Sequence, residues 1–415
     1  MSSSKASIGF GEFVALTAVL MAIQAIAIDA MLPALPAIGH ELLTADDNRV
    51  QWIVAAYVFG MGAGQLVWGS LSDRFGRRPV ILSGLTVYGI AALACALTRS
   101  FETLLVLRLI NGLAAACAVV ARSLIRDLYS GRSMARVMSL TFIVFMVIPI
   151  LAPTVGQGIL MVAPWRGIFV LFSVFSTAAM LWAYLRLPET LPVERRQPFS
   201  ARYLVTAARI SLGNRISLGY TLAVAVSFGS VMSYVSTSPQ IFGTAFGRLS
   251  WLPGMFALCA MAMSAASYVN SRLVERLGMR LISHSAMLVS IGVGLAHLFV
   301  VITGYERLWT FVGFQALAMG CFGLMASNFG AMAMEPVGAV AGVGASLQGF
   351  VTTSGAALIG AAIGKTFDNT TLPFTVGGLC CSGACLVFVL AAEKGRLLQP
   401  HAGPPPGRLA DGAHG

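Results

Sequence analysis

Residues 64 to 80 read Gly-Gln-Leu-Val-Trp-Gly-Ser-Leu-Ser-Asp-Arg-Phe-Gly-Arg-Arg-Pro-Val. An apolar helix ends here, a basic turn of about eight residues follows, and a second apolar helix begins. Glycines let the helix ends approach closely, an aspartate can accept from helix N-terminal amides or pair with a cation, and arginines anchor such a turn at a membrane face. The pattern consists of Gly69, Asp73, Arg74, Gly76, Arg77 and Arg78. The simpler interpretation is an ordinary basic turn between membrane helices.

The composition places the rest of the chain in a bilayer. Of 415 residues, 57% are hydrophobic and only 10% are charged, whereas a soluble domain carries about 25% charged residues. The net charge of +11 lies in short turns between apolar runs, with no basic patch interleaved with aromatic residues. Positive-inside topology explains this charge, so binding to nucleic acid is not expected.

The apolar runs predict an all-α integral membrane protein with twelve transmembrane helices, because runs of about 20 residues can each cross the hydrocarbon core. The runs lie near residues 12–36, 50–70, 79–98, 103–125, 136–160, 166–187, 213–238, 250–271, 281–302, 308–333, 342–364 and 373–392.

Charge predicts the orientation of these spans. With the N-terminus inside, nineteen of the 27 Lys and Arg residues fall on the cytoplasmic side and six on the other side. This bias predicts that both termini are cytoplasmic. The first apolar run is too long for a cleavable signal peptide, and it contains Asp29 and two prolines instead of a cleavage site.

The longest polar connection divides the spans six and six. Residues 1–187 are predicted to form one six-helix bundle, 188–212 a cytoplasmic linker, 213–393 a second six-helix bundle and 394–415 a disordered cytoplasmic tail. An internal repeat supports the division: Asp73-Arg74-Phe75-Gly76-Arg77-Arg78 lines up with Glu275-Arg276-Leu277-Gly278-Met279-Arg280, 202 residues further on.

The 64–80 pattern closely resembles the signature loop between helices 2 and 3 of the major facilitator superfamily of secondary transporters. The resemblance implies two six-helix bundles related by an axis along the membrane normal. It also implies that helices 1 and 4 line a shared central cavity.

Ionisable residues within the spans are functional candidates, because an intramembrane charge is costly. Asp29 lies about 7 Å outward of the midpoint of helix 1, and Arg108 about 9 Å outward of the midpoint of helix 4, at 1.5 Å per residue. The two therefore share a depth and form a predicted proton-coupling pair. Alternatively, Asp29 is simply solvated at a helix end and Arg108 is a snorkelling or structural arginine.

Polar and aromatic residues in other spans are weaker candidates. Gln24, Tyr57, Gln65 and Asn111 either orient a ligand or join helices. His297 is a lone histidine in helix 9, for which packing is the favoured interpretation. The aromatic residues that either form an apolar binding wall or simply pack are Phe228, Tyr234, Phe256 and Phe314.

Helices 4 and 5 carry two further motifs. Arg122 and Arg126 lie one turn apart, where they either meet Asp73 in a cytoplasmic gate latch or anchor the inner surface. Helix 5 combines prolines that bend a helix with glycines that permit close packing. Its residues Pro149, Pro153, Gly156 and Gly158 resemble the helix 5 motif of superfamily exporters, although Gln157 stands where a second glycine is common.

Together these segments, with Trp165-Arg166-x-Ile168-Phe169 and Gln348-Gly349-Phe350, resemble the Bcr/CflA group of bacterial drug:proton antiporters. The resemblance covers roughly residues 12–393 and implies a proton-driven, multi-pass exporter of the inner membrane, expected to act as a monomer. Substrates in that group include bicyclomycin, phenicols, sulfonamides, purines and cysteine. The main alternative is a carrier for a natural metabolite such as a purine or an amino acid.

Other functional classes lack their motifs. Gly360 to Thr366 only superficially resembles a nucleotide-binding loop, because Ile359 occupies the position of the required first glycine. The seven cysteines lie in apolar stretches without metal or redox spacing. No catalytic triad or metal-ligand cluster is apparent, so neither an enzyme, a metal nor a cofactor is expected; the proton gradient would supply the energy.

Overall fold

The computed structural model describes residues 8–42, 47–129, 131–196 and 201–398, and every regular element in these ranges is helical. The first half contains α1 (Phe10–Asp29), α2 (Leu35–Leu42), α3 (Gln51–Phe75), α4 (Arg77–Leu97), α5 (Phe101–Ala115), α6 (Val119–Leu128), α7 (Gly131–Val162) and α8 (Arg166–Arg186). After α9 (Ala201–Gly213), the second half contains α10 (Arg215–Gln240), α11 (Leu252–Leu277), α12 (Met279–Ile302), α13 (Leu308–Met334), α14 (Ala341–Lys365) and α15 (Leu372–Glu393).

These helices confirm the predicted all-α membrane architecture. Eleven stretches of helix in the described part of the chain are long and apolar enough to cross a membrane. The remaining predicted span, near 136–160, falls on α7, a helix of 32 residues. Helices 1 and 4 of the prediction are each interrupted: α1 and α2 flank a 3-10 turn at Leu32–Ala34, and α5 and α6 flank another at Ala116–Ala118.

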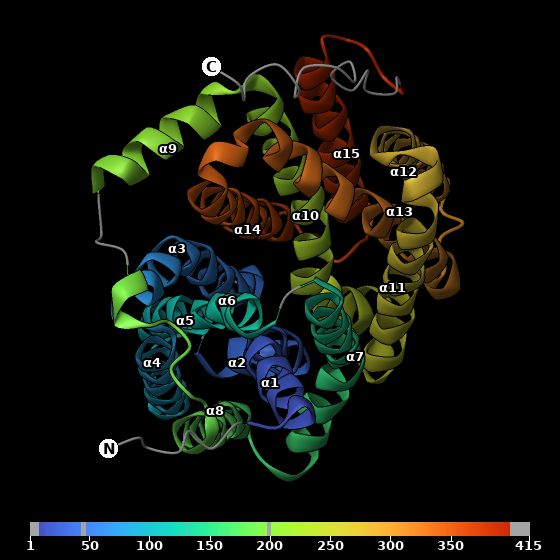
Figure 1. Ribbon diagram of the computed structural model, residues 1–415. Helices are drawn as coiled ribbons and strands as arrows, with labels where there is room; N and C mark the ends of the chain where they lie inside the picture. The colour runs from blue at the N-terminus through green and yellow to red at the C-terminus, as the bar shows by residue number, and fades with distance from the viewer. Residues whose placement is uncertain (1–7, 43–46, 130, 197–200, 399–415) are drawn as a thin grey trace.

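The two halves lie side by side, with α1–α8 in one group and α10–α15 in the other (Figure 1). Helix α3 packs against α14, and α7 packs against α11, so these two helix pairs join the halves. Helix α9 lies at the edge and contacts α14 and α10. The predicted polar linker at 188–212 therefore contains a helix.

The turn between α3 and α4 is much shorter than predicted. Instead of about eight residues, it consists of Gly76 alone, with a φ of 102° and a ψ of 160°. A positive φ of this kind is strained for residues with a Cβ. Gly278 makes the same one-residue turn between α11 and α12, with a φ of 80°, so the internal repeat recurs in the backbone.

The molecule has two opposite ends, which we call the motif end and the far end. The motif end is the end at which Gly76 joins α3 to α4. The far end is the opposite one, where α3 begins and α14 finishes. At the motif end, the Leu398 amide donates to Nδ1 of His284 at 3.1 Å; residues 399–415 of the predicted tail lie outside the described residues.

Candidate functional site

Asp29 is the last residue of α1, and it is buried. The chain breaks from helix directly after it, and the following residues from Ala30 to Leu35 are also buried. Asp29 is 6% exposed, and within the described ranges no hydrogen bond or ion pair to its carboxylate is found. The alternative prediction was that Asp29 is solvated at the end of a helix. Asp29 does end a helix, but its side chain is buried and not solvated. A buried carboxylate without a partner is energetically costly.

Arg108 lies fully buried in α5 and reaches α1 close to Asp29. Its guanidinium donates to the Ala27 carbonyl at 3.1 Å and to Oδ1 of Asn111 at 3.2 Å. It also lies 4.2 Å from the ring centroid of Tyr57, a cation–π arrangement. The structure agrees with the predicted common depth of Asp29 and Arg108. However, the described residues contain no ion pair between them.

The other polar candidates of the first half join helices around Arg108. The Tyr57 hydroxyl donates to the Gln24 carbonyl at 3.3 Å, and the Gln24 amide donates to the Ala115 carbonyl at 3.2 Å. The Asn111 amide donates to the Tyr88 carbonyl at 3.0 Å. These bonds connect α1, α3, α4 and α5, which favours the structural interpretation of Gln24, Tyr57 and Asn111.

The aromatic candidates of the second half lie in packed surroundings. Tyr234 is 2% exposed, stacks on Phe256 at 5.6 Å between centroids, and donates to Sγ of Cys259 at 3.6 Å. Phe228 stacks on Phe322 at 5.9 Å. The Tyr234 side chain is thus part of the interior of this half, whereas Phe228 is only half-buried.

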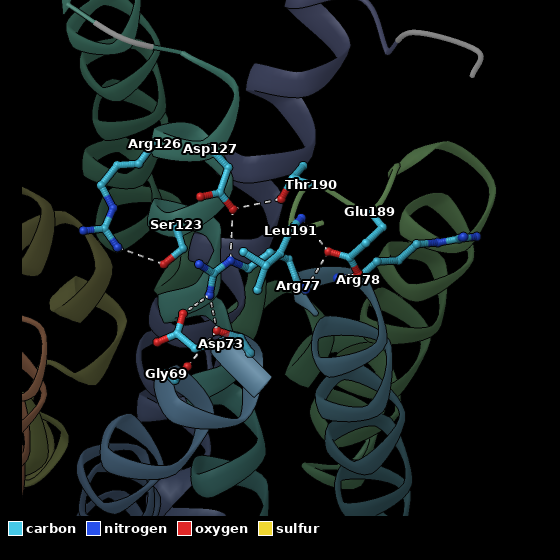
Figure 2. Close-up of polar contacts among 11 residues, drawn as sticks. Gly69, Asp73, Arg77, Arg78, Ser123, Arg126, Asp127, Glu189, Thr190 and Leu191 are labelled. Atoms are coloured by element: carbon cyan, nitrogen blue, oxygen red, sulfur yellow. Dashed lines mark hydrogen bonds and ion pairs between the residues drawn. The ribbon is translucent and has the colours of Figure 1, made fainter. Parts of the chain in front are cut away.

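Arg77 is the centre of a polar network at the motif end (Figure 2). It is predicted to anchor the membrane surface, but its side chain is only 8% exposed. Its guanidinium donates to Asp73 at 2.5 Å, to the Ser72 hydroxyl at 2.7 Å and to Asp127 at 3.0 Å. Arg77 therefore ties the end of α3 to the end of α6.

Of the two roles predicted for Asp73, the structure shows pairing with a cation, Arg77, whereas the capping role is taken by Glu189. Its carboxylate accepts from the backbone amides of Arg77 at 2.9 Å and Arg78 at 3.2 Å, at the N-terminus of α4 (Figure 2). An anion in this position is favoured by the unpaired amides and the helix dipole. The Arg78 side chain donates to the Tyr184 carbonyl at 2.6 Å, so α8 and the chain that follows it are fastened to α4.

The remaining motif residues lie around this network without entering it. Arg126 donates to Ser123 at 3.1 Å, and within the described chain neither Arg126 nor Arg122 pairs with Asp73. Instead, their neighbour Asp127 accepts from Arg77, which also donates to Asp73. Arg74 is exposed and lies over the ring of Phe75. A Cβ at Gly69 would meet the Ser346 side chain of α14 at 3.6 Å, an ordinary contact.

We expect Arg77→Ala to lower the free energy of unfolding by about 2 kcal/mol, because it removes charge-assisted hydrogen bonds to two partly exposed carboxylates. The matched control is Arg74→Ala in the same motif, where an exposed cation–π contact contributes about 1 kcal/mol or less. The measurement is thermal unfolding of both purified variants. Equal stabilities of the two variants would contradict the central position of Arg77.

Gly156 of the helix 5 motif packs directly on the break in α1. A Cβ at this position would lie 1.9 Å from the carbonyl oxygen of Ala30, the residue after Asp29. Gly158 has open space, with nothing within 4 Å of the same position. Pro153 is buried; the side chain of Pro149 lies outside the described residues. One glycine of the motif is therefore required by the close approach of α7 and α1, and the other is not.

Polar side chains join the two halves at the far end. Gln51 of α3 donates to Gln240 of α10, and the Gln240 amide donates to Oδ1 of Asn48 at 3.0 Å. Asn48 also donates to the Phe367 carbonyl at 2.8 Å. Gln51 is 1% exposed, so the far end is closed by a buried amide cluster. Nearer the middle, Gln65 donates to the Thr353 hydroxyl at 3.2 Å, again across α3 and α14.

The sequence pattern of one transporter family, described as the Major Facilitator Superfamily, matches residues 17–361. The chain belongs to this superfamily. It is 28% identical over 384 residues to a bicyclomycin resistance protein homolog of Haemophilus influenzae, covering 92% of this chain and 94% of the relative. It is also 28% identical over 381 residues to the multidrug resistance protein MdtL of Klebsiella pneumoniae strain 342, covering 90% and 93%.

Solved structures agree on the fold of this major facilitator protein. A D-xylose–proton symporter superimposes with a TM-score of 0.71 at 12% identity, covering 93% of this chain and 98% of the symporter. The human organic anion transporter MFSD10 gives a TM-score of 0.67 at 18% identity, covering 91% and 98%. The protein is therefore a multi-pass membrane transporter of small molecules rather than an enzyme.

A transporter of this superfamily has to open its far-end contact, and Gly364 offers a way to test that contact. A Cβ at Gly364 would lie 1.1 Å from Oε1 of Gln51, so Gly364→Ala must displace Gln51 from Gln240. Loss of one hydrogen bond contributes about 1 kcal/mol, enough to shift the population several-fold toward a far-end-open state. Spin labels at the exposed positions Arg99 and Arg248, in a Cys380→Ser background, should report a longer distance.

Gly355→Ala is the control for this experiment. It lies on the same helix, α14, and its Cβ would meet only Ala225 at an ordinary 3.4 Å. An unchanged label distance in Gly364→Ala would show that the Gln51 contact does not hold the far end closed.

The sequence indicated the motifs, but it did not indicate most of the residues that bind to them. Glu189, Asp127, Asn48, Gln51 and Gln240 were not singled out, and neither was Glu306, whose Oε1 lies 2.7 Å from Nε2 of the supposedly lone His297. For Glu189 a signal existed: it is an acidic residue directly after span six, on a face otherwise rich in arginine. The far-end amides carry no local signal, because their significance arises only when α3, α10 and α14 meet.

Proposed function

We propose that this protein is a proton-coupled exporter of drug-like small molecules in a bacterial inner membrane, and that Asp29 carries the coupled proton. The observation that carries the proposal is the buried Asp29 carboxylate at the break in α1. It has no hydrogen-bond or ion-pair partner in the described part of the chain, and it lies two residues from the carbonyl that binds Arg108. The names of the two bacterial relatives support the export of drugs as the direction and the substrate class.

The proposed mechanism is alternating access between the two halves. The bias of positive charge makes the motif end cytoplasmic, so the closed amide cluster at the far end corresponds to an inward-facing state. In this state Asp29 releases its proton inward while the substrate binds. In the outward-facing state the substrate leaves and Asp29 takes a proton from outside. One proton entering thereby drives one export cycle.

Gly156 supports a link between the helix 5 motif and Asp29. Because α7 touches the backbone at Ala30, a movement of α7 during the transport cycle has to move the end of α1 or separate from it. Arg108 holds the same helix through the Ala27 carbonyl. The environment of the Asp29 carboxylate would thus change with the position of α7, which is what coupling to the transport cycle requires.

The test is uptake of labelled chloramphenicol into everted membrane vesicles from a host that lacks its main efflux pumps. Uptake that needs an imposed proton gradient, and that a protonophore abolishes, is the expected result. Uptake of a panel of phenicols, sulfonamides and bicyclomycin defines the substrate class. If none of these is transported while the protein is present in the membrane, the proposed drug export is wrong, and purines and amino acids become the compounds to test.

A further inference from the structure

A partly open cavity of about 70 Å³ lies within the second half, lined by α10, α12, α13 and α15. It is separate from Asp29 and Arg108, which belong to the first half. Its wall carries hydroxyl, amide and imidazole groups beside aromatic rings and methionines. The polar groups include Ser227, Ser290, His297, Gln315, Thr375 and Ser382. A polar cavity among membrane helices calls for an occupant, because polar groups facing an empty volume lose their hydrogen bonds.

The cavity is the counterpart of the Arg108 site in the internal repeat. Arg108 is the eighth residue of α5, and Gln315 is the eighth residue of α13. Phe169, which lies under the Arg108 guanidinium, is the fourth residue of α8, and Thr375 is the fourth residue of α15. Where the first half packs a guanidinium against a phenyl ring, the second half has a shorter amide and a hydroxyl.

Water fits this volume and its lining. A water molecule needs roughly 10–15 Å³ of such space and two to four polar partners, so the cavity has room for about five waters. Gln315 and Thr375 are 5% and 4% exposed. The hydroxyls of Ser290, Thr375 and Ser382 donate to carbonyls of their own helices, so they offer acceptors to the cavity, and the Gln315 amide offers both donors and an acceptor. The cavity therefore has the size and the chemistry of a hydrated site.

A buried hydrogen-bonded pair connects this cavity to the far end. His297 lines the cavity and is 7% exposed, and its Nε2 lies 2.7 Å from Oε1 of Glu306, which is 12% exposed. The other Glu306 oxygen accepts from the Thr371 hydroxyl. Glu306 lies outside the spans, between α12 and α13. A proton at Glu306 is thus one hydrogen bond from His297, and His297 borders the cavity.

In the described part of the chain, the charged residue next to His297 is Glu306. Helix α13 contributes Phe314, stacked on the imidazole at 4.8 Å, and Phe311 at 5.8 Å. Helices α10 and α15 contribute serines, Phe374 and Thr375 to the same cavity. The other titratable groups that line it are the thiols of Cys381 and Cys385. The described part of the chain contains no group of three or more potential metal ligands, so a proton, and not a metal ion, suits this site.

We propose that the cavity is filled with water and that His297 and Glu306 form a second proton-binding site, reached from the far end through Glu306. The site takes one proton from water, which gives an imidazolium facing the Glu306 carboxylate, and returns one proton to water on release. This proposal goes beyond the function proposed above, because it requires neither Asp29 nor a drug-like substrate.

Hydration is tested by hydroxyl-radical footprinting of the purified full-length protein, because radicals formed from bound water oxidise adjacent methionines. Met319 and Met325 line the cavity and are 6% and 5% exposed, whereas Met287 and Met332 of the same half are 0% exposed and do not line it. We expect several-fold faster oxidation of Met319 and Met325. Equal rates for all four would show a dry cavity and overturn the proposal.

Proton binding is tested on the same protein by NMR of ring-¹⁵N histidine, with the His297 signal assigned by its loss in His297→Asn. We expect this signal to show a ring that takes up a proton while it faces the Glu306 carboxylate, 2.7 Å from its Nε2. Glu306→Gln removes that carboxylate, which favours the protonated ring, and should lower the protonated fraction of His297. The ring signal of His284, which contacts Tyr220 and the Leu398 amide, should be the same in this variant as in the wild type.

A His297 ring that stays neutral, or whose signal is unchanged in Glu306→Gln, would overturn the second proton site. Should Glu306→Gln fail to fold, Thr371→Val removes only the hydroxyl that donates to Glu306 and should change the His297 signal by a smaller amount. Neither experiment uses a substrate or a gradient. If drug export proves wrong, the footprinting and NMR results can still be interpreted. If the second proton site proves wrong, the proposed drug export is not affected.

Discussion

Asp29→Asn is expected to reduce proton-driven uptake into everted vesicles to the background of vesicles without the transporter. Asparagine has nearly the same shape as aspartate but cannot exchange a proton, so the coupled step is lost. The fold should be retained, because a neutral amide is less costly to bury than a charged carboxylate. The measurements are gradient-driven uptake and thermal unfolding of the purified variant, which should be at least as stable as the wild type.

The matched control is Glu102→Gln, which neutralises a carboxylate with a side chain that is 68% exposed at the far end. An exposed ion pair of this kind contributes at most about 1 kcal/mol, so uptake should remain near the wild-type level. Substrate exchange without a gradient separates coupling from binding: Asp29→Asn should still catalyse it. Uphill uptake at the wild-type level by Asp29→Asn would exclude Asp29 as the proton carrier.

Gly156→Ala should have the second-largest effect on this protein. The added Cβ would lie 1.9 Å from the oxygen and 2.8 Å from the carbon of the Ala30 carbonyl. Both are backbone atoms, so α1 and α7 must separate. Overpacking of this kind lowers the free energy of unfolding by about 1–3 kcal/mol. Because Asp29 precedes Ala30, the displacement also moves the proposed proton site, and gradient-driven uptake should fall strongly.

Gly158→Ala provides the control for Gly156→Ala in the same helix. With nothing within 4 Å of its Cβ, this change should leave transport intact. It should even add up to about 1 kcal/mol of stability, because alanine favours the helix more than glycine does. Thermal unfolding and vesicle uptake of both variants make the comparison. If the two variants behaved alike, the contact between α7 and the end of α1 would not matter for transport.

Variants of the far-end cluster and variants of the Asp29 site should have different effects on transport. Gln51, Gln240 and Asn48 connect the two halves, so changes there should alter which end is open. Asp29 lies within the first half, so its neutralisation should still allow either end to open, but this opening should no longer depend on proton binding. Combining Gly364→Ala with Asp29→Asn should therefore give additive changes in label distance and in uptake.

Local properties of the sequence were sufficient for the membrane architecture and for the positions of several candidate residues along the spans. Apolar length alone predicts the spans, because the bilayer thickness sets the number of residues that a helix needs. The rise of 1.5 Å per residue places Asp29 and Arg108 at one depth, and the structure has Arg108 bonded two residues away from Asp29. The glycines of the 64–80 motif were expected to let the helix ends approach closely, and Gly76 alone makes the turn between α3 and α4 with a positive φ.

The partners of these residues were decided only by the tertiary structure. Arg77 binds Asp127, and Glu189 caps α4, across separations of 50 and 112 residues. His297 looked isolated until Glu306 and Thr371 were placed beside it. Directional contacts depend on how helices rotate and cross, and hydropathy does not specify rotation when helices are apolar on every side. The sequence by itself thus determined which segments cross the membrane and which charges they carry, whereas packing decided what each charge meets.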